Sequence, residues 1–205
     1  ILGAEETLAA LTPADLSRFR DAHMSAARVV IAASGAFDRD AVIDRARAGF
    51  SDLAAFAAPT PEPARPASGV RYEARKLEQT HLAFSWSAPS LKDPAIYAAR
   101  LLSEIYGGGM ASRLFQAVRE DLGLVYAIDS WIDAHEEGGR FGVYAGCAAK
   151  NAKRVAAISA AILADLARDG PSARELKRAK AVVGAQLLMG AESPMARAEA
   201  RAGQV

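Results

Sequence analysis

Hydrophobic positions recur along this chain with two different periods. In the first set of segments, apolar residues lie three or four positions apart, which predicts amphipathic helices. Residues that cap helices stand at several of their starts, including Thr12, Asp38 and Ser193. The predicted helices span residues 12–23, 38–53, 93–106, 110–122, 151–169 and 173–190, and one more begins at 193.

A second set of segments is apolar at every other position or in short runs, which predicts strands. The turn 136–139 joins the last two as a hairpin. In 80–88, large apolar side chains occupy one face, and the half-polar other face is suited to line a cavity. The predicted strands are 27–34, 70–78, 80–88, 124–134 and 140–149. Together these elements predict an α+β fold: a two-layer sandwich of a mainly antiparallel sheet with helices on one face.

The proline-rich segment 59–69 is the clearest boundary in the chain. Four prolines at that density favour an extended linker that cannot pair inside a sheet. We therefore expect a strand-helix subdomain, or the end of a preceding half, over 1–58, and a larger domain over 70–205. The chain has no initiator Met and ends inside a predicted helix, so we expect a fragment truncated at its C-terminus.

Composition narrows the class of partner. Hydrophobic residues make up 51% and charged residues 24% of the chain, which is ordinary for a globular protein. A net charge of +1 gives no reason to expect a nucleic-acid partner or an anionic membrane. No apolar run approaches the roughly 20 residues needed to cross a bilayer. We expect a bacterial, cytoplasmic protein, with a periplasmic location left open.

The segment 107–126 links two predicted elements. Three glycines allow a positive φ or the close approach of another backbone. A helix follows and ends at Gly123. Arg119 then lies in the last turn of that helix, and Tyr126 lies early in the next strand. Strict alternation would put Trp131 and Tyr126 on opposite faces of the sheet.

Arg119 and Tyr126 have two interpretations. A guanidinium and a phenol are hydrogen-bond donors suited to hold a peptide in register and to stabilise an oxyanion. In the structural alternative, Arg119 is a cation that stabilises the end of its helix and Tyr126 is a ring packed in the sheet. Side-chain chemistry alone favours this alternative. We expect Ser112 to cap the helix and Arg113 to be a surface charge. Phosphate binding at the glycines is disfavoured because the Lys-Ser/Thr of a P-loop is missing.

No metal site is predicted within these residues. Catalytic zinc is held by three side chains, and helix-borne pairs lie about one turn apart. His23, His81 and His135 are widely separated, and the H-x-x-E-H pattern is absent. We interpret His135 with its neighbouring acids as a solvated turn.

The ordered motif G-G-G-M-x-S-R-L-F-Q-x-x-R-E-x-x-G-L-x-Y over 107–126 resembles the second, non-zinc half of pitrilysin/insulinase-type metallopeptidases, in the mitochondrial processing peptidase branch. The resemblance implies that Arg119 and Tyr126 reach a substrate held at a zinc site in another domain. It implies that Gly107, Gly108 and Gly109 line a chamber. Zinc would be bound outside this chain, peptides would be the substrates, and the zinc-bearing half would belong to the same chain or to a second subunit of a homo- or heterodimer.

Three functions follow as alternatives. The first is the substrate-binding half of a zinc endopeptidase, inactive by itself. The second is a catalytically inactive partner subunit with a structural and peptide-binding role. An H-x-x-E-H motif upstream would favour the first, and its absence the second. The third is an α+β domain that binds a small ligand and is unrelated to peptidases. Finding Arg119 and Tyr126 side by side on a concave surface would argue against this third alternative.

Overall fold

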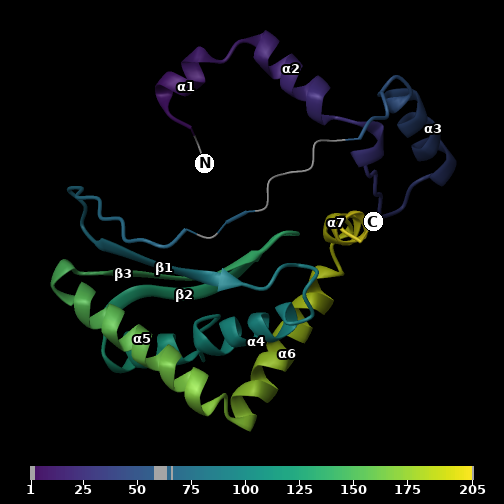
Figure 1. Cartoon of the computed structure of the whole chain (residues 1–205). Helices are drawn as coiled ribbons and strands as arrows, with labels where there is room; N and C mark the ends of the chain where they lie inside the picture. Colours follow the sequence, from purple (N-terminus) through teal and green to yellow (C-terminus); the bar gives the residue numbers. More distant parts are fainter. Residues whose placement is uncertain (1–2, 58–63, 66, 205) are drawn as a thin grey trace. The chain divides into compact units, whose positions relative to one another are not determined.

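The computed structural model describes residues 3–57, 64–65 and 67–204, which form two compact units (Figure 1). Unit 1 comprises Ile1–Glu62 together with Leu188–Val205, and unit 2 comprises Pro63–Leu187. The predicted linker lies partly outside the described residues, at 59–63 and 66. The domain boundaries derived from the sequence therefore stay a prediction.

Unit 2 is built on a three-stranded antiparallel sheet (Figure 1). Its strands are β1 (Thr80–Ala88), β2 (Val125–Ala134) and β3 (Gly139–Cys147), in the order β1-β3-β2. Strands β2 and β3 form the expected hairpin. The helical elements of this unit are α4 (Ile96–Tyr106), η2 (Phe115–Asp121), η3 (Ala149–Asn151), α5 (Ala152–Asp169) and α6 (Ala173–Gly190), whose last three residues belong to unit 1.

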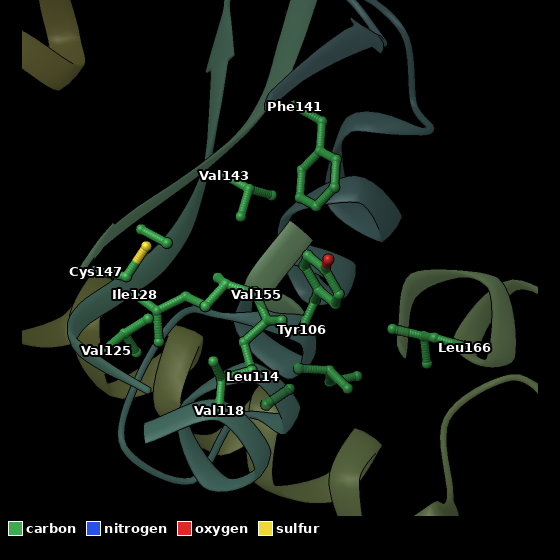
Figure 2. Close-up of a cluster of buried hydrophobic side chains, with 13 residues drawn as sticks. Tyr106, Leu114, Val118, Val125, Ile128, Phe141, Val143, Cys147, Val155 and Leu166 are labelled. Atoms are coloured by element: carbon green, nitrogen blue, oxygen red, sulfur yellow. The ribbon is translucent and has the colours of Figure 1, made fainter. Parts of the chain in front are cut away.

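Alternation along β3 decides which face of the sheet the helices cover. Phe141, Val143, Ala145 and Cys147 are all buried, as the sequence predicts. They face α4, η2 and α5, which supply further core side chains, among them Tyr106 (Figure 2). The Tyr106 hydroxyl donates a 2.7 Å hydrogen bond to the Ser159 carbonyl, so its one polar group is satisfied inside the core. The expected α+β sandwich with helices on one face is confirmed.

Unit 1 is helical. Thr12 begins α2 with a capping box, in which its hydroxyl accepts from the Asp15 amide and Asp15 reaches back to the Thr12 amide. Asp38 caps α3 by accepting from two backbone amides, as predicted. The helical elements of the unit are α1 (Glu5–Ala10), α2 (Pro13–His23), η1 (Ala26–Arg28), α3 (Arg39–Phe50) and α7 (Pro194–Ala202). Among the described residues, no helix is both long and apolar enough to cross a membrane.

Two predicted strands are wrong. Segment 27–34 contains the end of η1 and then irregular backbone, with Val30 47% and Ile31 50% exposed. Segment 70–78 is irregular as well, and Val70 and Tyr72 are almost fully exposed. A strand is stable only when its backbone groups pair with a neighbour, and within the described residues neither segment has one. Phe50, an apolar residue of the amphipathic α3, is 44% exposed.

Candidate functional site: an arginine and a tyrosine at two backbone irregularities

The triple glycine allows a close approach between α4 and β2. A Cβ on Gly107 would lie 2.8 Å from both the amide nitrogen and the hydroxyl of Ser130. The Ser130 amide donates to the Gly107 carbonyl at 3.2 Å. Positive φ plays no part, because Gly107, Gly108 and Gly109 all lie outside that region. Gly107 is buried against β2, while Gly108 and Gly109 are exposed. Their place in a chamber stays a prediction.

The helix after the glycines begins at Ser112, which is 2% exposed and accepts a hydrogen bond from the Phe115 amide at 3.4 Å. This agrees with its expected role as a cap. Arg113, expected to be a plain surface charge, is instead anchored. Its Nε and its Nη2 lie 2.7 Å and 3.0 Å from the two carboxylate oxygens of Glu175 at the start of α6. Sequence reasoning missed this pair because its members are far apart in the chain.

The rest of this helix has π-helical hydrogen bonding over Phe115–Asp121. The Leu124 amide reaches the Val118 carbonyl at 3.0 Å, and the Gly123 amide reaches the Arg119 carbonyl at 3.0 Å. Gly123 ends the helix with φ of 58°, as predicted. Short π-helical segments are rare, and they are found frequently at functional sites because the extra residue redirects side chains. Arg119 lies inside this segment.

The strand that follows contains a β-bulge. Val125 pairs with Cys147 and Ala127 with Gly146, so Tyr126 has no partner of its own in the register. A bulge shifts the alternation by one residue. Consequently Tyr126 and Trp131 both lie on the face of the sheet opposite to α4 and α5, where they are 76% and 40% exposed. The prediction that the two rings face opposite ways is wrong, because it assumed an uninterrupted strand.

The two irregularities bring Arg119 and Tyr126 together. The guanidinium carbon of Arg119 lies 5.2 Å from the centre of the Tyr126 ring and 4.6 Å from the centre of the Phe115 ring. Its Nε is 3.8 Å from the Glu120 carboxylate. Stacking between two rings orients a guanidinium through cation–π attraction and leaves its edge free to donate. Phe115, one turn before Arg119, was not singled out from the sequence.

This edge is available for a ligand. Within the part of the chain that the structure describes, the Arg119 guanidinium and the Tyr126 hydroxyl make no hydrogen bond to another group. The Arg119 side chain is 36% exposed. The pair therefore presents several preoriented donors, which is what recognition of a carbonyl, a carboxylate or an oxyanion requires.

The described residues offer no donor set for zinc. No three His, Cys, Asp or Glu side chains come together in them. His135 is 74% exposed in the hairpin turn, with its Nε2 3.1 Å from the Asp133 carboxylate. Arg140 also binds Asp133, at 2.8 Å. The exposure of His135 agrees with the expected solvated turn, next to which Arg140 and Asp133 form an ion pair.

Comparison with known proteins places this chain in a family. Residues 10–183 match the family model described as "Peptidase M16 inactive domain". An uncharacterized zinc protease of Streptomyces coelicolor is 33% identical over 201 residues, which cover 94% of this chain and 44% of that protein. An uncharacterized zinc protease of Rickettsia felis is 36% identical over 149 residues, 72% of this chain and 36% of that protein.

A solved structure agrees with the two sequence relatives. The crystal structure of a peptidase M16 inactive domain from Pseudomonas fluorescens matches with a TM-score of 0.79 and 26% identity, covering 89% of this chain and 45% of that one. The chain thus spans about half the length of the relatives that it matches. The resemblance to the non-zinc half of a zinc metallopeptidase is confirmed, and the chain belongs to the peptidase M16 family, of which it represents the inactive domain.

Proposed function

We propose that this chain is the substrate-binding half of a zinc-dependent endopeptidase, and that Arg119 and Tyr126 supply its contacts to the peptide. The stacked, exposed Arg119–Tyr126 pair carries the proposal. Two observations support the presence of a second, metal-bearing half: the relatives are named zinc proteases, and this chain covers less than half of the length of each. That half belongs either to the same chain or to a second subunit of a dimer.

The two side chains have different tasks. The Arg119 guanidinium, held between Phe115 and Tyr126, donates to substrate carbonyl oxygens and balances negative charge that develops during peptide cleavage. The Tyr126 hydroxyl adds one donor at the end of a rigid ring. Zinc, when bound in the other half, supplies Lewis-acid chemistry. By itself the chain is therefore expected to be inactive.

The test is peptide cleavage by the full-length protein loaded with zinc, comparing the parent with Arg119→Ala and Tyr126→Phe. Each variant is expected to lose on the order of tenfold to a thousandfold in kcat/KM, because a donor to the transition state is removed. Arg119→Lys restores charge but not the planar donors, so it should recover only part of the loss.

Matched controls are available on the same unit. Arg154→Ala removes an exposed arginine of α5, and Tyr97→Phe removes a hydroxyl from an α4 tyrosine that is 72% exposed. Both controls should cleave like the parent. Parent-like cleavage by Arg119→Ala would refute the proposed role. A full-length protein that binds peptides but never cleaves them would support the inactive partner subunit instead.

A further inference from the structure

A pocket of about 710 Å³ lies within unit 2, between the segment that follows the triple glycine and the start of α6. Three arginines line this pocket, Arg113, Arg174 and Arg178, but only one acid, Glu175. The pocket thus carries a surplus of positive charge, and the proposed contacts between Arg119, Tyr126 and a peptide make no use of it.

Glu175 compensates only Arg113. Its two oxygens accept hydrogen bonds from Arg113 at 2.7 Å and 3.0 Å, and one of them also accepts from the amide and the hydroxyl of Ser172. Within the residues that the structure describes, neither Arg174 nor Arg178 lies within ion-pair distance of an acid. The pocket therefore keeps two uncompensated guanidinium groups.

The positions of these two arginines on α6 favour a bound anion. Arg174 and Arg178 lie four residues apart, so they share one face of the helix, where like charges repel each other. Arg174 is also the second residue of α6, and the helix dipole disfavours a cation in the first turn. An anion between the two side chains removes the repulsion and interacts favourably with this end of the helix.

A buried hydroxyl supplies a further donor. Ser112 lines the pocket from the segment after the glycines, and it is 2% exposed. Its oxygen accepts a hydrogen bond from the Phe115 amide at 3.4 Å, but within the described part of the chain its own proton is donated to no acceptor. Buried donors are normally satisfied by protein, water or a ligand. Ser112 is thus able to donate to a group that occupies the pocket.

We infer that this pocket binds the phosphate group of a small molecule, held by Arg174, Arg178 and Ser112. A phosphate offers three or four acceptor oxygens in a tetrahedral arrangement, which suits donors from two separate segments. A carboxylate has only two oxygens, which a single guanidinium satisfies. The missing P-loop residues argue against phosphate binding by the glycine backbone, whereas here side chains of α6 supply the donors.

A phosphate in this pocket would join α6 to the helix that carries Arg119. The pair of Arg113 and Glu175 already makes one such link, and the ligand adds a second through Ser112. A ligand that binds only the folded state raises its stability. Phosphate should therefore raise the Tm of the protein, and this measurement does not depend on peptide cleavage.

The experiment titrates the full-length protein with inorganic phosphate, while sodium chloride is adjusted to hold the ionic strength constant. Calorimetry measures the Kd, and thermal unfolding measures the Tm. Arg174→Gln and Arg178→Gln should each weaken phosphate binding by about tenfold or more, because each removes charge-assisted hydrogen bonds. The matched control is Arg154→Gln, which removes an exposed arginine of α5 outside the pocket and should bind phosphate like the parent.

A parallel titration with sodium acetate separates phosphate from carboxylate recognition, and acetate should bind about tenfold more weakly than phosphate. Three outcomes overturn the inference. The first is no phosphate binding by the parent, and the second is binding that both Arg174→Gln and Arg178→Gln retain unchanged. The third is acetate binding as tight as that of phosphate, which would assign the pocket to a carboxylate.

Discussion

The ion pair between Arg113 and Glu175 should stabilise the helix that carries Arg119, and Glu175→Gln tests this. Two hydrogen bonds of 2.7 Å and 3.0 Å join the side chains, which are 27% and 16% exposed. Glu175 also accepts 2.7 Å hydrogen bonds from the amide and the hydroxyl of Ser172, and Arg113 reaches the Gly170 carbonyl. Glutamine keeps the shape of the side chain but removes its charge.

The structure bounds the size of the effect. Hydrogen bonding from Arg113 lowers the pKa of Glu175 from its usual 4.5 to about 2. Each pKa unit is worth about 1.4 kcal/mol, so the charged form gains at most about 3 kcal/mol on folding. The pair is partly solvated and glutamine keeps some of the hydrogen bonds, so we expect Glu175→Gln to lower the free energy of unfolding by about 2 kcal/mol at pH 7.

The pH dependence has a defined sign. The pKa of Glu175 is lower in the folded state, so the unfolded state takes up a proton first as the pH falls. The stabilisation is therefore complete above the unfolded pKa, at about pH 5 and higher. It is lost as the pH falls from about 4.5 towards 2. The difference in unfolding free energy between parent and Glu175→Gln should shrink across that window.

Equilibrium urea unfolding from pH 7 to pH 3 measures this difference. Tryptophan fluorescence is a suitable signal for the 205-residue chain, because its two tryptophans, Trp86 and Trp131, both lie in the sheet. Glu136→Gln is the control, since Glu136 pairs with Lys92 at 3.2 Å but both side chains are more than 70% exposed. It should change stability little. Equal stability of parent and Glu175→Gln at pH 7, or a difference that is the same at pH 3, would refute the reasoning.

Two further substitutions test the packing beneath the site. Gly107→Ala places a methyl group against Ser130 and should lower the free energy of unfolding by about 1–3 kcal/mol. Gly109→Ala should be tolerated, because its Cβ would meet Glu104 only at 3.7 Å. Urea unfolding compares the two variants, and equal stabilities would contradict the close approach of Gly107 to Ser130. Tyr106→Phe removes the buried hydrogen bond to Ser159 and should cost about 1–2 kcal/mol, while the exposed Tyr97→Phe serves as its control in the same measurement.

Local signals were sufficient for many elements. Thr12 and Asp38 cap helices because their side-chain oxygens satisfy nearby amides, a contact that needs no distant residue. The β2–β3 hairpin follows from alternation on both sides of a glycine-containing turn. By contrast, the segments 27–34 and 70–78 had strand-like composition but no pairing partner among the described residues, and a strand cannot form from composition alone.

The sequence by itself determined that Arg119 ends a helix and that Tyr126 begins the following strand, because periodicity and Gly123 define both elements locally. Only the tertiary structure decided how the two side chains meet. The π-helical turn and the β-bulge each insert one residue, and they are stable only because α4, β3 and the core hold the surrounding backbone. The same shift put Trp131 on one face of the sheet with Tyr126, a consequence of long-range register that no local pattern of residues encodes.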